Sequence, residues 1–320
     1  MPDNIRLVIG SKSTGGDTYQ NTAIVAEALS EHLGIDIKVD AVGASEAFNA
    51  LSRDSRGTTM MVFHDQSYLG DLYGVRGYAD PFAGYQVGPT VAINPGNAYL
   101  VPKSSSYQSL DDIIAAAGAG ETIRVAIQPG GVSEIGFSAI KNAVRIEHPG
   151  MEGNIVALNT GSQSDKNQAL FDGQVELMHG SVQANEQFTQ LPDDDQKAMR
   201  FVWMTAREAT IQQANPEGLG DTSRDDLLAF VTPNVSVTMD GERDFVFDNE
   251  FFFLFNKDMD PALIEVLDQA LAEIFEKGEV QEVQKSRFFI PNFMPSTESA
   301  EYLAAKRDDY RTVIEAISTN

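Results

Sequence analysis

A strand, a glycine-containing loop and a helix occur in the same order at two places in this chain. The first copy is "IRLVIGSKSTGGDTYQNTAIVAEAL" at residues 5–29, and the second is "TIRVAIQPGGVSEIGFSAIKNAV" at residues 122–144. In each copy a buried strand precedes a helix with apolar residues on one face. Because ligands of open α/β sheets bind where strands end and helices begin, the duplication predicts two α/β halves, each with a ligand-binding loop.

The two loops carry small and hydroxylated residues, which let backbone N–H groups approach an anion. The first loop differs from a nucleotide-binding P-loop, because Ser11 precedes Lys12 and Arg6 stands where that motif has its first glycine. Either loop alone is also compatible with an ordinary turn. Together they predict carboxylate binding by a first loop (Ser11, Lys12, Ser13, Thr14, Gly15 and Gly16) and a second loop (Gln128, Gly130, Gly131, Val132 and Ser133).

The spacing of apolar residues predicts further alternating strands and helices, which is typical of a parallel sheet covered by helices. The stretch between residues 63 and 98 contains Pro81, Pro89 and Pro95, and we expect it to be rich in loops. Ser109, followed by two aspartates, is expected to begin a helix. The expected strands lie at 6–10, 35–42, 59–63, 98–101, 123–127, 154–159, 175–180 and 200–206, and the other helices at 22–32, 44–51, 133–144, 166–172, 261–277 and 299–317.

Composition narrows the classes of partner. A chain of 320 residues is long enough for two domains. Its formal net charge of −24 disfavours nucleic acid and anionic lipid, and the acidic residues form either a solvated coat or an acidic binding surface. No apolar run approaches the length of about 20 residues that spans a bilayer; the longest is "FFFLF" at 251–255.

Catalytic and metal-binding patterns are missing from the sequence. The chain has no cysteine and four histidines, without an H-E-x-x-H helix or a Gly-x-Ser-x-Gly turn. The acidic segment "MDGERDFVFDNE" at 239–250 lacks the spacing of a calcium loop. We therefore expect no cofactor, no metal and no catalytic residue. The alternatives are an enzyme that uses His64 or His179 as a general base, and a cytoplasmic ligand sensor.

Several linked segments resemble the solute-binding proteins of tripartite tricarboxylate transporters, the Bug-type family. Residues 5–34 are similar to the family's opening strand, glycine loop and "AExLSExLG" helix, and 98–117 to its crossover strand and "VPxxSPYKTLxDLIA" segment. Residues 159–181, "NTGSQSDKNQALFDGQVELMHGS", resemble a "YKG" turn followed by a helix, "GGQVDL" and a strand. Residues 251–314 are similar to the closing two-helix segment.

The resemblance implies an α/β protein with the two-domain fold of type II Venus-flytrap periplasmic binding proteins, with parallel or mixed sheets and C-terminal helices. Its first domain would be discontinuous, 1–101 plus 251–320, its second domain would be 102–250, and the ligand cleft would lie between them. The implied function is to capture a small organic acid, a di- or tricarboxylate or an aromatic carboxylate, and deliver it to membrane permease subunits. The additional implied contacts are Tyr19, Phe63, His64, Thr160, Gly161, Ser162 and His179.

At several positions the sequence differs from the family's pattern, so the resemblance does not identify the ligand. We expect Tyr19 to stand where the family often has an aspartate, and Lys12 is not a usual member of the first loop. Tyr19, Phe63 and Tyr68 either line an aromatic pocket or belong to the core. The opening "MPDNIRLVIG" lacks the features of a secretory signal. The protein is therefore either cytoplasmic or a periplasmic protein whose signal has been removed; we expect the second, and a monomer.

Overall fold

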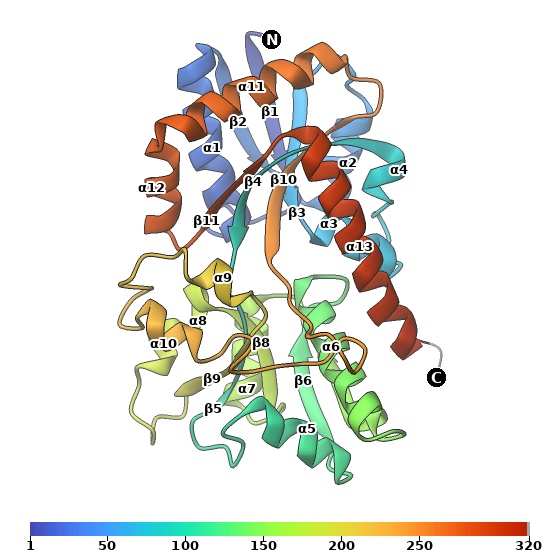
Figure 1. The fold of residues 1–320 in the computed structure, drawn as a ribbon, viewed down its shortest axis with the longest axis vertical. Helices are drawn as coiled ribbons and strands as arrows, with labels where there is room; N and C mark the ends of the chain where they lie inside the picture. The colour runs from blue at the N-terminus through green and yellow to red at the C-terminus, as the bar shows by residue number, and fades with distance from the viewer. Residues whose placement is uncertain (319–320) are drawn as a thin grey trace. The chain divides into compact units, whose positions relative to one another are not determined.

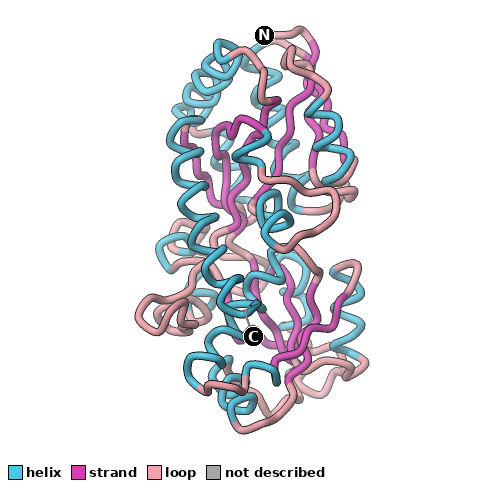
Figure 2. Tube along the Cα trace, turned by 90° about the vertical axis from the view of Figure 1, so that its right-hand side faces the viewer, coloured by secondary structure: helices cyan, strands magenta, loops and turns pink. Residues whose placement is uncertain are grey.

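The computed structural model describes residues 1–318, which divide into two compact units. Unit 1 comprises Met1–Asn94 and Asn249–Asp309, and unit 2 comprises Pro95–Asp248 and the chain from Tyr310 onward. Each unit contains one mixed β-sheet with helices on both sides of its strands (Figures 1 and 2). The prediction of an α/β fold with mixed sheets and C-terminal helices is therefore confirmed.

The sheet of unit 1 has the strand order β11-β4-β10-β3-β1-β2. Strands β1, β2 and β3 run parallel, so their carboxyl ends lie along one edge of the sheet. β10 runs antiparallel to β3 and β4, and β11 is antiparallel to β4. The strands are β1 (Asn4–Ile9), β2 (Asp36–Ala41), β3 (Thr59–His64), β4 (Tyr85–Asn94), β10 (Asn249–Asn256) and β11 (Ile290–Met294).

The helices of unit 1 begin and end at recognisable residues. α1 ends at Leu33 and is followed by Gly34, whose φ of 66° is the left-handed conformation that closes many helices. α11 begins after Asp260, whose side chain accepts a hydrogen bond from the Ala262 N–H, with Pro261 at the first helical position. The helices are α1 (Asp17–Leu33), α2 (Ala44–Ser52), α3 (Gln66–Leu72), α4 (Pro81–Gly84), α11 (Pro261–Lys277), α12 (Glu279–Ser286) and α13 (Ser296–Ser318), whose residues from Tyr310 on belong to unit 2.

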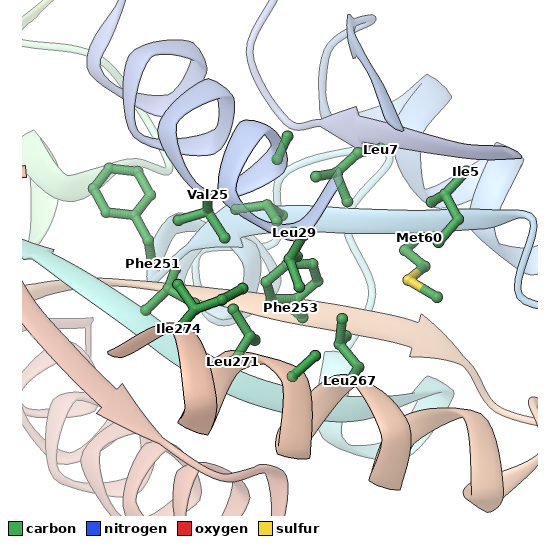
Figure 3. Close-up of a cluster of buried hydrophobic side chains, with 14 of the residues drawn as sticks. Ile5, Leu7, Val25, Leu29, Met60, Phe251, Phe253, Leu267, Leu271 and Ile274 are labelled. Atoms are coloured by element: carbon green, nitrogen blue, oxygen red, sulfur yellow. The ribbon is translucent and has the colours of Figure 1, made fainter. Parts of the chain in front are cut away.

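A buried apolar cluster holds unit 1 together (Figure 3). Leu29 of α1, Leu271 of α11 and Phe253 of β10 are each at most 1% exposed. Burying a side chain of this size stabilises a fold by about 1.5–3 kcal/mol. Because α1 and α11 come from opposite ends of the chain, this cluster joins the two segments of unit 1.

The sheet of unit 2 has the strand order β7-β6-β8-β5-β9. β6 runs parallel to β7 and β8, and β5 runs antiparallel to β8 and β9. The strands are β5 (Asn97–Pro102), β6 (Ile123–Ile127), β7 (Ile155–Asn159), β8 (Leu177–Ser181) and β9 (Met199–Met204). The helices are α5 (Leu110–Gly118), α6 (Val132–Glu147), the 3-10 turn η1 (Glu152–Asn154), α7 (Gln163–Phe171), α8 (Val182–Thr189), α9 (Glu208–Ile211) and α10 (Arg224–Leu228).

Most predicted elements are confirmed. α5 begins at Ser109 with a reciprocal capping box to Asp112, and α11 has the predicted bounds. The expectation of a loop-rich segment between residues 63 and 98 is wrong, because this segment contains α3, α4 and the ten-residue strand β4. β4 continues past Pro89 because its pairing with β10 shifts register around that residue, which cannot donate a hydrogen bond.

The unit boundaries differ from the expected domain boundaries at 101 and 251. β5 pairs with β8 and β9, so residues 97–102 lie in the sheet of unit 2. The Tyr310 hydroxyl donates to the Val246 carbonyl, also within unit 2. Thr319 and Asn320, which the expected first domain includes, lie outside the described residues.

Residues 1–318 contain neither a membrane-spanning helix nor a group of side chains suited to a metal ion. No helix there combines the length and the apolar character that crossing a bilayer requires. Within the same residues, no three histidine, aspartate or glutamate side chains come together so that they could hold a metal ion.

Candidate functional site

The first loop lies at the carboxyl-end edge of the unit 1 sheet. It follows β1, and the parallel pairing of β1 with β2 and β3 brings Gly43 and the pair Phe63–His64 to the same edge. The Gly43 N–H donates to the Ser11 carbonyl over 3.1 Å, which joins the loop to the start of α2. Unit 1 therefore places the first loop, Phe63 and His64 at one edge of its sheet, together with Gly43, which the sequence did not single out.

Serine hydroxyls shape the first loop. The Ser11 Oγ accepts a hydrogen bond from the Ser13 N–H (3.1 Å), and the Ser13 Oγ accepts one from the Gly15 N–H (3.3 Å). α1 then begins after Gly16 without a side-chain cap. The N–H groups of an uncapped first turn are hydrogen-bond donors at the positive end of the helix dipole. Lys12, Ser13, Thr14 and Gly15 are exposed, so this loop is open to a ligand.

Lys12 and Asp17 flank these donors. The Lys12 stem packs against Gly43, whose φ is 85°; a Cβ at that glycine would lie 2.9 Å from Lys12 Cγ and Cε. Burial raises the pKa of Asp17, and a 2.8 Å hydrogen bond from Asn94 Nδ2 opposes the shift. Asp17 is therefore held by unit 1 itself, at the first position of α1.

The aromatic residues of unit 1 are mostly enclosed. Phe63 is 1% exposed, and its ring leaves no room for a Cβ at Gly10. Tyr68 is fully buried and donates its hydroxyl to Asp65, so it belongs to the core. Tyr19 is half-buried in α1. Contact of Tyr19 and Phe63 with a ligand stays a prediction.

His64 is buried and is neutral at physiological pH. Burial lowers its pKa to about 3, a hydrogen bond with Asn249 opposes the shift, and the charge of Lys306 adds to it. The His64 Nδ1 accepts a 3.3 Å hydrogen bond from the Gln66 N–H. A neutral imidazole in this position carries no positive charge to attract an anion.

Unit 2 gathers its predicted residues in the same manner. β6 is parallel to β7 and β8, so the second loop, the turn Thr160–Gly161–Ser162 and His179 lie at one edge of the sheet. Thr160 donates from both its N–H and its hydroxyl to the Ile127 carbonyl, each over 2.9 Å. The turn is thereby attached to the end of β6.

The hydroxyl of Ser133 closes the second loop on itself. Its Oγ accepts a hydrogen bond from the Gln128 N–H (2.8 Å) and donates to the Gln128 carbonyl (2.9 Å), and Ser133 is 2% exposed. The sequence predicts a direct ligand donor at this position. The geometry instead gives this side chain a role in holding the loop, and direct contact with a ligand stays a prediction.

The second loop also holds a carboxylate of its own. Gly130, with a φ of 70°, donates its N–H to the Glu134 carboxylate. Burial raises the pKa of Glu134, and the hydrogen bond from Gly130 opposes the shift. α6 begins after Gly131 without a side-chain cap, whereas Ser162 caps α7 by accepting from the Asp165 N–H.

Lys166 is a residue of this edge that sequence reasoning missed. Its Nζ lies 3.2 Å from His179 Nδ1, and both residues are 4% exposed. Burial lowers the pKa of Lys166 to about 7, and burial together with the charge of Lys166 holds the pKa of His179 well below its usual value. The signal in the sequence was its spacing, because Lys166 shares the buried face of α7 with Ala169 and Leu170.

The fold is that of the periplasmic binding proteins with two α/β domains. The chain is similar over nearly its whole length to a TctC solute-binding protein from Polaromonas (14% identity, 98% of each chain, TM-score 0.67). It is also similar to MatC from Rhodopseudomonas palustris with bound malate (12% identity, 98% of this chain and 100% of that chain, TM-score 0.66). A third similar structure is an R. palustris protein with adipate (15% identity, 98% and 97%, TM-score 0.73). The sequence matches no protein-family model and no curated protein.

Proposed function

We propose that this protein is an extracytoplasmic solute-binding protein that captures a small organic carboxylate and delivers it to a membrane permease of the tripartite tricarboxylate type. The proposal rests on one arrangement that occurs at the sheet edge of both units. In each unit a glycine loop leads from a parallel strand into an uncapped helix, α1 or α6, at the carboxyl end of the sheet. This arrangement presents backbone N–H donors to an anion.

The ligands of similar structures support the choice of anion. Two proteins that share this fold were solved with malate and with adipate, which are both dicarboxylates. We propose that the first and second loops each bind part of one such acid. The net charge of −24 makes local donors of this kind necessary, because the rest of the protein repels anions.

The enzyme alternative requires a general base. His64 and His179 are the candidate bases, and the pKa of each is far below the range in which a base accepts protons efficiently at neutral pH. This favours binding over catalysis. Incubation with the bound acid, followed by mass spectrometry of the small molecules, tests the alternative directly, because an enzyme would convert the acid.

A binding screen tests the proposed function. Thermal unfolding is followed in the presence of mono-, di- and tricarboxylic acids and aromatic acids, with the corresponding methyl esters as controls. Since a ligand that binds only the folded state raises its stability, at least one acid should raise the melting temperature and its ester should not. No shift with any acid would contradict the proposal.

Two further measurements separate a transport receptor from a cytoplasmic sensor. A receptor that closes on its ligand becomes more compact, which small-angle scattering detects as a smaller radius of gyration at saturation. Fractionation of the producing cell should find the protein outside the cytoplasm. An unchanged radius would contradict closure, and a cytoplasmic location would favour the sensor.

A further inference from the structure

Lys166 points toward the ligand-binding edge that we propose for unit 2. It is the fourth residue of α7, and its N–H donates to the Ser162 carbonyl over 3.2 Å. Side chains on a helix lean toward the helix N-terminus and lie over the preceding turn. The Lys166 stem therefore extends toward the turn Thr160–Gly161–Ser162 and away from the far end of α7.

The ammonium of Lys166 has an unusual partner. Burying a charged group is costly unless it is paired and hydrogen-bonded, and buried lysines are ordinarily paired with carboxylates. Here the polar partner is Nδ1 of His179, a neutral imidazole whose nitrogen accepts the hydrogen bond. His179 Nε2 is also buried, and it has no hydrogen-bond partner among the described residues.

The elements packed against α7 supply no counter-charge. α7 contacts β8, β6 and β5. β8 contributes His179. The charged residue of β6 is Arg124, which is exposed and forms an ion pair with Glu176. β5 contributes Tyr99, whose ring lies 5.4 Å from the ring of His179. On α7 itself the neighbouring Asp165 is exposed. Within residues 1–318 no carboxylate forms an ion pair with Lys166.

We propose that Lys166 is the cationic residue with which unit 2 holds a carboxylate of the bound acid. This inference rests on the proposed function and assigns the anionic group of the ligand to a specific side chain. The incoming carboxylate accepts a hydrogen bond from Lys166 Nζ and supplies the negative charge that the surrounding residues lack. Since an adjacent anion favours the protonated amine, binding above neutral pH takes up a proton at Nζ.

The ligand class follows from this charge. The acid must present an ionised carboxylate to unit 2, so an ester or amide of the same carbon skeleton binds weakly. A charge-assisted hydrogen bond contributes enough free energy to change affinity by roughly tenfold or more. Lys166 therefore selects for a negatively charged ligand, while the backbone N–H groups of the loops determine the position of its carboxylate.

Isothermal titration calorimetry with malate and adipate at pH 8 tests the inference. Each acid is titrated in buffers that differ in ionisation enthalpy, which gives the number of protons taken up. The wild type should take up a fraction of a proton, and K166M should bind roughly tenfold more weakly with no uptake. K197M is the matched control, because Lys197 is exposed in the same unit, and it should behave as the wild type.

The outcomes distinguish this inference from the proposed function. Binding of an acid to wild type and K166M with equal affinity and no proton uptake would overturn the role of Lys166 and leave the proposed function standing. Failure of both acids to bind the wild type would overturn both proposals for these dicarboxylates. The proton count on the wild type needs no variant, so poor folding of K166M does not remove the test.

Discussion

In unit 1, the Lys306 Nζ lies 2.6 Å from Oδ1 of Asp65, and both side chains are buried. Glu250 is the second carboxylate paired with this ammonium, and Tyr302 donates its hydroxyl to Glu250 over 2.6 Å. The group joins the end of β3 and the start of β10 to α13. We expect K306M to lower the free energy of unfolding by about 3–5 kcal/mol, because it leaves two buried carboxylates without a cation.

Urea denaturation of the wild type and K306M measures this difference. K257M is the control, since Lys257 is exposed in the turn after β10, and it should stay within about 0.5 kcal/mol of the wild type. Burial raises the pKa of Asp65 while Lys306 opposes the shift. The loss in K306M should therefore shrink at acid pH, where the carboxyl group is protonated. A loss below about 1 kcal/mol at neutral pH would contradict a stabilising role for this group.

Lys166 makes stability depend on pH. Its pKa is about 7 in the folded protein, against 10.5 for an ordinary lysine side chain, so between these values the unfolded chain holds a proton that the folded chain lacks. The free energy of unfolding then rises with pH across this window, by about 1.4 kcal/mol for each pKa unit. Below pH 7 both states are protonated, and the destabilisation is fully present.

Denaturation of wild type and K166M from pH 6 to pH 10 isolates this contribution. K166M should be the more stable of the two at pH 6, and the difference should fall as the pH rises. Other lysines and tyrosines titrate in both proteins and cancel in the comparison. A difference that does not change with pH would show that Lys166 titrates normally.

Glu134 places a negative charge at the second loop, where its carboxylate accepts from the Gly130 N–H. We expect E134Q to bind malate or adipate more tightly, because it removes repulsion of the incoming carboxylate while keeping an oxygen for Gly130. E147Q, at the exposed end of the same helix, should leave affinity unchanged. Calorimetry checks this, and weaker binding by E134Q would show that Glu134 supports the ligand.

Ser13 and Ser133 should respond differently to alanine. Ser133 makes two hydrogen bonds within its loop and is buried, so S133A should lower the free energy of unfolding by about 1–3 kcal/mol and weaken acid binding as well. Ser13 is exposed, so S13A should weaken binding with little change in stability. Denaturation and calorimetry on both variants separate these effects. Unchanged affinity in the double variant would exclude both loops from the site.

The sequence predicted most elements of the fold because their local patterns agree with their packing. Ser109 and its aspartates mark the start of α5, and Asp260–Pro261 marks that of α11. β4, β10 and β11 were not predicted, and Pro89 in β4 and Pro291 in β11 argue locally against strands. Pro89 lies where β4 shifts register, and Pro291 lies on the edge strand β11, so both are tolerated by pairings that sequence spacing does not reveal.

The sequence predicted those features of the candidate site that follow from the order of strands and loops along the chain. Parallel strands bring their following loops to one edge, and this brought the first loop to His64 and the second loop to Thr160 and His179. The roles of individual side chains were not predictable. A serine in a glycine loop is expected to donate a hydrogen bond to a ligand. The Ser133 hydroxyl instead makes two hydrogen bonds with the backbone of Gln128. The pairing of Lys166 with His179 depends on helix rotation and tertiary contact, which the residue types alone do not specify.

The position of β10 in the unit 1 sheet determines the order in which a growing chain can complete its parts. β10 lies between β3 and β4, yet it follows all five strands of the other sheet in the sequence. While the ribosome makes residues 95–248, the facing edges of β3 and β4 therefore have no neighbour. All five strands of the unit 2 sheet therefore precede, along the chain, the strand that joins β3 to β4 in unit 1. The segment that is synthesised first thus belongs to the sheet whose strands are completed last.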